Sequence, residues 1–118
     1  MRKKTNISLS TKISFFLTFY LALVFSASAG EVATNATVIA VNNTLWNEDA
    51  FEIQVSAENS ICPSGNIGFP IWSAASPETH KRAYTAALTA LTTGMKVTVH
   101  SYQETDECWT ASYIRIIK

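Results

Sequence analysis

The sequence has few of the residues on which catalytic and metal sites are usually built. Its 118 residues include only two histidines, two cysteines, three prolines and four glycines. A zinc site needs about four ligands, usually histidine nitrogens and cysteine sulfurs. Only two histidines are available, because the two cysteines are expected to pair with each other. We also find no nucleophile elbow and no glycine-rich phosphate loop. We therefore expect no enzyme activity, no cofactor and no bound metal.

A run of basic residues is also missing after residue 29. Four of the nine lysines and arginines lie within the first 29 residues, whereas all nine acidic residues lie beyond them. Five basic and nine acidic residues therefore remain in 30–118, a net charge of −4 with neutral histidines. A nucleic-acid-binding domain usually carries a basic patch. Nucleic acid is thus not an expected partner.

No hydrophobic run is long enough to cross a bilayer comfortably, which takes about 20 residues. The apolar segment 13–25 is shorter than that, and Ala27-Ser28-Ala29 follows it as a small-x-small cleavage signal. The positive charges near it are Arg2, Lys3, Lys4 and Lys12. This pattern predicts a signal peptide at 1–29, with an uncleaved anchor as the alternative. We expect a secreted or periplasmic protein that is not inserted in a membrane after cleavage.

The remaining segment, 30–118, is long enough for a single domain with a modest core. Its two cysteines are Cys62 and Cys108. An even cysteine count in an exported chain predicts one disulfide, and a free reactive thiol is the alternative. A disulfide would add stability to a domain of this size.

The residue pattern predicts five strands and one helix. Apolar and polar residues alternate strictly from Phe51 to Ala57, which is typical of a strand with one wet face. Ser76, Pro77 and Glu78 form a helix start, and Gly94 is a helix stop. The predicted strands are 37–41, 50–57, 67–74, 95–102 and 111–118, with Pro70 restricting the third to an edge or a bulge.

The predicted order is strand, strand, strand, helix, strand, strand. This order is typical of a five-stranded Greek-key barrel of the OB type, mainly β with one helix that covers an open end. An α+β sandwich with the helix across an open sheet is the alternative. The side chains expected to face the core from the helix are His80, Tyr84, Ala87, Leu88 and Leu91. Trp72 is also expected in the core, and His100 on the surface.

The stretch IWSAASPETHKRAYTAALTALTTGMKVTVH, residues 71–100, resembles the B subunits of pertussis-like bacterial toxins, particularly the subtilase-cytotoxin type. The similarity lies in Ile71-Trp72 before the helix, Thr93-Gly94 after it and the strand that begins at Met95. It implies an OB fold, a ring of five subunits, binding of cell-surface glycans and a catalytic partner subunit. No sugar-contacting residue of that family matches a position here. The chain also resembles small secreted bacterial proteins of unknown role.

The candidate ligand-binding residues lie in two predicted loops. Trp46, Asn47 and Asp49 occupy the first, and Asp106 and Trp109 the second. An aromatic face can pack against the apolar face of a pyranose while amide and carboxylate groups bind its hydroxyls. The alternative is that each tryptophan covers a core edge or the disulfide.

Two acidic clusters lie in the same loops, and their carboxylates could in principle hold calcium. Neither cluster has the spacing of a known calcium loop, so we interpret them as solvated charge. Two function classes stay open beside glycan binding. One is a protein-binding domain, such as an inhibitor or assembly factor. The other, ranked last, is a hydrolase built on His100 with Glu104 or Asp106.

Overall fold

The computed structural model describes residues 30–118, and the predicted signal peptide at 1–29 lies outside them. The strands are β1 Gly30–Asn42, β2 Ala50–Val55, β3 Asn66–Pro70, β4 Lys96–Ser101 and β5 Tyr113–Ile117. The helix α2 is Pro77–Thr93, and three 3-10 turns are η1 Ala57–Asn59, η2 Ile71–Ser73 and η3 Glu107–Trp109. The prediction of a mainly β domain with one α-helix is confirmed for this part of the chain.

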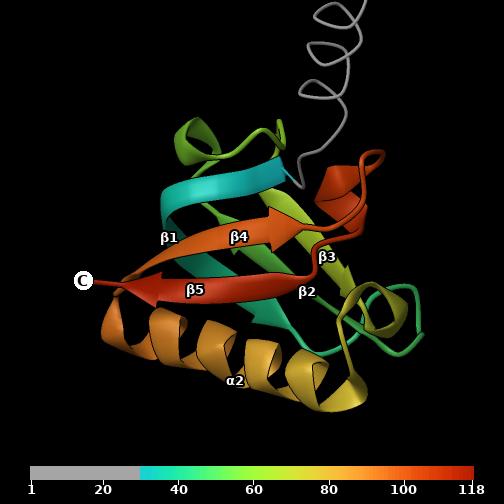
Figure 1. Cartoon of the computed structure of the whole chain (residues 1–118). Helices are drawn as coiled ribbons and strands as arrows, with labels where there is room; N and C mark the ends of the chain where they lie inside the picture. The colour runs from blue at the N-terminus through green and yellow to red at the C-terminus, as the bar shows by residue number, and fades with distance from the viewer. Residues whose placement is uncertain (1–29) are drawn as a thin grey trace, which may run out of the picture.

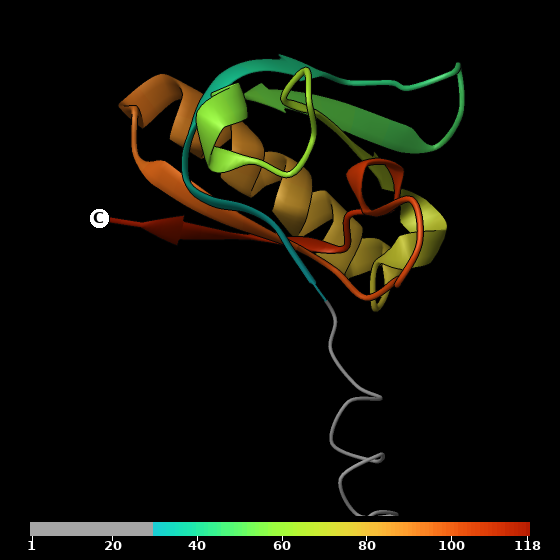
Figure 2. The same ribbon diagram turned by 90° about the horizontal axis from the view of Figure 1, so that it is seen from above.

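The five strands form one antiparallel sheet in the order β3-β2-β1-β4-β5. The helix α2 packs against β1 and β5, and Figure 1 shows it running beside β5. The strand β1 pairs with both β2 and β4, and irregularities in its register bend it. Figure 2 shows β1 following a wide arc around the core. Pro70 ends the edge strand β3, as its missing N–H requires.

The first strand is much longer than predicted, because it starts at Gly30 rather than Thr37. Val32, Ala33 and Ala36 are all buried in its first half. The register against β4 shifts twice between Glu31 and Ala36. These shifts interrupt the period-two alternation, so the pattern of apolar residues did not reveal a strand there.

Two stacked phenylalanines lie at the centre of the core. The rings of Phe51 and Phe69 are 4.5 Å apart at an interplanar angle of 5°. His80 and Tyr84 of α2 pack on Phe51, with ring centroids at 5.1 and 5.2 Å. His80 also donates a hydrogen bond from Nε2 to the carbonyl oxygen of Phe69 at 2.8 Å. The expectation that His80 packs rather than reacts is consistent with these contacts.

The buried face of α2 matches the predicted one only in part, because Ala87 is buried as expected but Leu88 and Leu91 are not. Its fully buried residues are Ala83, Ala87 and Ala90, whereas Leu88 and Leu91 are each 39% exposed. Both sets repeat at helical spacing, so periodicity does not separate them. The alanines face the sheet, and their small side chains let the helix approach it closely.

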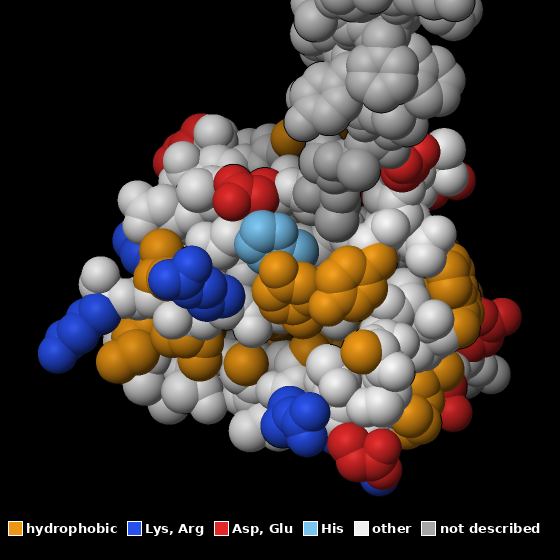
Figure 3. All heavy atoms as spheres, in the orientation of Figure 1, with side chains coloured by type: hydrophobic (Ala, Val, Ile, Leu, Met, Phe, Trp, Pro, Cys, Tyr) orange, Lys and Arg blue, Asp and Glu red, His pale blue; other side chains and the backbone are white. Residues whose placement is uncertain are grey.

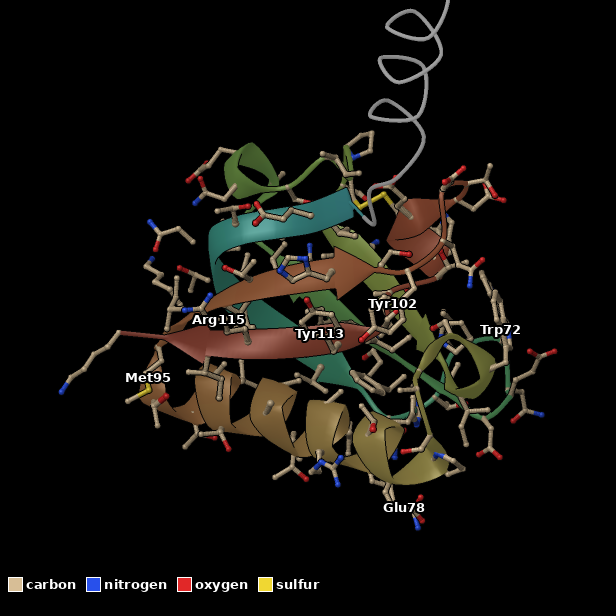
Figure 4. The ribbon with its side chains drawn as sticks, viewed as in Figure 1. Trp72, Glu78, Met95, Tyr102, Tyr113 and Arg115 are labelled. Carbon is tan, nitrogen blue, oxygen red and sulfur yellow. A yellow bond between two sulfur atoms is a disulfide. The ribbon has the colours of Figure 1, made fainter. Side chains whose placement is uncertain are left out.

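The expectation that Trp72 lies in the core is wrong. The strand β3 stops at Pro70, and Ile71–Ser73 forms the turn η2, in which Ser73 is buried instead. Ser73 Oγ lies 2.9 Å from the carbonyl oxygen of Pro70 and 2.6 Å from that of Ala111. The turn breaks the strand alternation, so Trp72 is 64% exposed and projects from the edge of the molecule in Figure 4.

The predicted helix ends and the predicted disulfide are confirmed. Ser76 Oγ accepts a hydrogen bond from the Thr79 N–H at 3.1 Å, and Gly94 ends the helix with φ of 75°. Cys62 and Cys108 are bonded, with their Cα atoms 5.7 Å apart. The bond joins the loop before β3 to η3. Within residues 30–118, no helix is both long and apolar enough to cross a bilayer.

Candidate functional site

The β1–β2 hairpin ends in a two-residue turn made of Trp46 and Asn47. The Glu48 N–H donates to the carbonyl oxygen of Leu45 at 3.1 Å, and both turn residues are left-handed, with φ of 53° and 57°. Such a turn matches the twist of a hairpin and favours asparagine or glycine. A tryptophan with positive φ is unusual because its bulky side chain crowds the backbone. The turn therefore presents Trp46 at a conformational cost.

Trp46 contacts Trp109 from a loop more than sixty residues further along the chain. Their ring centroids are 5.5 Å apart at an interplanar angle of 45°. Trp46 is 63% exposed and Trp109 36% exposed. The Trp109 N–H donates to the carbonyl oxygen of Asp106 at 2.8 Å, which closes η3 beside the disulfide. We call these two side chains the Trp46–Trp109 pair.

One member of the pair, Trp109, rests on the backbone of β3 at Gly68. A Cβ added to Gly68 would lie 2.6 Å from Leu45 Cδ2 and 3.1 Å from Trp109 Cε3. The Ala111 N–H donates to the Gly68 carbonyl oxygen at 3.0 Å, which ties the end of this loop to β3. The absence of a side chain at Gly68 thus lets Leu45 and Trp109 seat against the strand.

The structure brings some of the predicted site residues together and separates others. Asn47 is exposed beside Trp46 in the turn. Asp106, with φ of 52°, starts η3, and its carbonyl oxygen also accepts a hydrogen bond from Thr110 Oγ1 at 3.1 Å. Asp49 instead lines a cavity between the hairpin and α2. The predicted ligand-binding residues therefore lie at two separate places on the molecule rather than in a single site.

This cavity has a volume of about 260 Å³. Phe51, His80 and Tyr84 supply its aromatic wall, and the other lining residues are Asn43, Glu48, Asp49, Ala50, Lys81 and Thr85. Sequence reasoning missed the cavity because strand and helix patterns show which residues face inward, not where two elements leave a gap. The position of His80 and Tyr84 on the inner stripe of the helix was the only available signal.

A second aromatic cluster lies on the outer face of β4 and β5. His100 and Tyr113 stack with ring centroids 4.7 Å apart, and Tyr102 lies 5.5 Å from Tyr113. Figure 3 shows apolar surface next to a histidine here, and Figure 4 shows the two tyrosines side by side. His100 was predicted to be exposed on the surface. It is half-buried instead, because the Tyr113 ring stacks on it. No group of three or more metal-ligating side chains gathers within 30–118.

The comparisons with known proteins identify a family but no function. The model of a family of unknown function, DUF5992, matches residues 12–118. No curated protein and no solved structure matches the chain. Since the matched range covers most of the 118 residues, the chain belongs to the DUF5992 family.

Proposed function

We propose that this domain is an exported, non-enzymatic binding module that holds a sugar ring against the Trp46–Trp109 pair. The observation that carries the proposal is the pair itself, two tryptophans from distant loops in contact, of which Trp46 is 63% and Trp109 36% exposed. Large aromatic surface exposed to water is unfavourable, and where it forms a patch it often marks a binding site. The strained backbone at Trp46 supports the same conclusion, because strain persists where function needs a geometry.

The chemistry around the pair suits a glycan. The flat rings offer an apolar surface to the C–H face of a pyranose, and Asn47 in the same turn offers an amide that both donates and accepts hydrogen bonds. The loop that carries Trp109 also carries Glu104, Asp106 and Glu107, whose carboxylates accept hydroxyl hydrogens. The mature charge of −4 disfavours an oligonucleotide, the other common ligand of small β-barrels.

We further propose that the sheet closes into an OB-like barrel rather than an open α+β sandwich. The support comes from the two edge strands. The Ala111 N–H, just before β5, bonds to Gly68 of β3, although β3 and β5 lie at opposite ends of the strand order. A sheet whose two ends meet is the requirement for a barrel. The long curved β1 is consistent with such closure.

A protein ligand is the second candidate, and the exposed Trp72 favours it. The Ile71 N–H donates to the carbonyl oxygen of Asp49 at 3.0 Å, so η2 is attached to the end of the β1–β2 hairpin. Exposed tryptophan and tyrosine are the residue types that dominate protein interfaces. In this version the domain acts as an inhibitor or an assembly factor.

The test of glycan binding is the substitution Trp46→Gly. Glycine adopts the left-handed turn without strain, so the ring is removed while the hairpin is kept. We expect the free energy of unfolding to change by less than about 1 kcal/mol, because relief of strain offsets the lost ring contact. A glycan that a glycan array identifies with the wild-type protein should bind at least tenfold more weakly to this variant in calorimetry, a loss of about 1.4 kcal/mol.

Trp72→Ala is the matched control, since it removes another exposed tryptophan that is not a member of the pair. It should leave glycan affinity unchanged. An array without any bound glycan, or equal affinities of the wild type and Trp46→Gly, would contradict the proposal. A purified partner protein whose affinity falls with Trp72→Ala would support the second candidate instead.

The ring of five subunits and the catalytic partner remain part of the glycan proposal. Native mass spectrometry of the purified protein tests the ring directly. The ring-forming version predicts a species of five copies that persists on dilution. A monomer at all concentrations would rule out that version and leave a monovalent binding module.

A further inference from the structure

We propose that the cavity between the β1–β2 hairpin and α2 is a second binding site, which takes one uncharged polyol ring such as a free hexose or a terminal sugar residue. Its volume is about 260 Å³. This lies near the lower end of small-molecule sites. The space suits a single six-membered ring rather than a longer chain.

The cavity and the Trp46–Trp109 pair lie on opposite faces of β3. Successive side chains of a strand point to opposite faces. The Gly68 position faces Leu45 and Trp109, whereas the next residue, Phe69, stacks on Phe51 of the cavity wall. A sugar ring bound at the pair therefore does not occupy the cavity. The proposed site is independent of the one described above.

The wall of the cavity is aromatic and held in place. Phe51 is buried, with 2% of its surface exposed, and Tyr84 meets it edge-on at an angle of 60°. His80 is oriented by its bond to Phe69, whose carbonyl oxygen can only accept, so Nε2 carries the hydrogen. In the neutral ring Nδ1 is then a hydrogen-bond acceptor. Because Phe51 is almost completely covered, the aromatic surface open to a ligand comes from the half-buried His80 and Tyr84, and it suits the C–H face of a sugar.

The rim of the cavity carries charges of both signs. Glu48 and Asp49 supply carboxylates, and Lys81 supplies an ammonium group. An anion would meet the two carboxylates, and a cation would meet the lysine. Asn43 adds an amide that both donates and accepts, and Thr85, whose hydroxyl donates to the Lys81 carbonyl oxygen at 3.1 Å, adds an acceptor. A neutral ligand whose hydroxyls donate and accept can use both kinds of group without like-charge repulsion.

The experiment is an NMR titration of the ¹⁵N-labelled protein with D-glucose and D-galactose, followed by choline and acetate as charged probes. We expect at least one hexose to shift the amide signals of Asp49, Lys81 and Thr85 in a saturable way. Lys81→Ala should weaken that hexose about tenfold, the cost of one hydrogen bond from a charged donor. Arg82→Ala is the matched control, because Arg82 is an exposed cation next along α2 that lines a different groove.

Trp46→Gly separates this site from the first one. It should leave the hexose affinity measured at the cavity amides unchanged, even where it removes binding at the pair. The proposal is overturned if neither hexose shifts the cavity amides up to its solubility limit. It is also overturned if choline or acetate binds there more tightly than either hexose, or if Lys81→Ala and Arg82→Ala have equal effects.

Discussion

Replacing both cysteines, Cys62→Ala with Cys108→Ala, is expected to lower the free energy of unfolding by about 4 kcal/mol. The two residues are 46 positions apart, so the bond removes much of the chain entropy of the unfolded state. A domain of this size has little stability in reserve. Urea unfolding followed by tryptophan fluorescence measures the change. Because Cys108 precedes Trp109, the same variant should also loosen the Trp46–Trp109 pair and weaken glycan binding.

The control for this prediction is chemical reduction. A thiol reductant should lower the stability of the wild-type protein to about that of the double variant, and it should leave the variant unchanged. A loss below about 1 kcal/mol would show that the disulfide is not the main constraint on the unfolded chain.

Phe69→Ala is expected to destabilise the domain by about 4 kcal/mol, within the usual range for deletion of a buried aromatic ring. Phe69 is completely buried and stacks on Phe51 at 4.5 Å. Removing it leaves Phe51 without its stacking partner and opens a void beside the Phe51 ring. Circular dichroism during urea unfolding gives the midpoint and the m-value, and the m-value should stay constant.

Ile61→Ala is the matched control, since Ile61 is a large apolar residue that is 59% exposed. It should change the free energy of unfolding by less than about 0.5 kcal/mol. Similar losses for Phe69→Ala and Ile61→Ala would show that the two phenylalanines do not form the centre of the core.

Local signals predicted the features that depend on neighbouring residues. The helix is capped by Ser76 and stopped by Gly94, because a hydroxyl that accepts a backbone hydrogen bond and a left-handed glycine act within one turn of the chain. The alternation from Phe51 to Val55 identified β2 and its buried face. The disulfide followed from a count, since residues 30–118 hold only two cysteines.

Features that depend on contacts between distant segments were predicted poorly. The helix has two faces of similar apolar spacing, and the fit against the sheet selected the alanines over Leu88 and Leu91. The predicted burial of Trp72 was wrong because a turn after Pro70 takes the place of the expected strand. The first half of β1 was not predicted, because its register shifts interrupt the alternation of apolar and polar residues.

The sequence by itself thus determined the mainly β class with one α-helix, the helix ends and the disulfide, because each depends on local backbone chemistry or on a count of residues. Only the tertiary structure decided the candidate sites. It placed Trp46 against Trp109 and assigned Asp49 to the cavity on the other side of β3. The physical reason is that a binding site is a relation between side chains far apart in the chain, and their separation in space is set by packing.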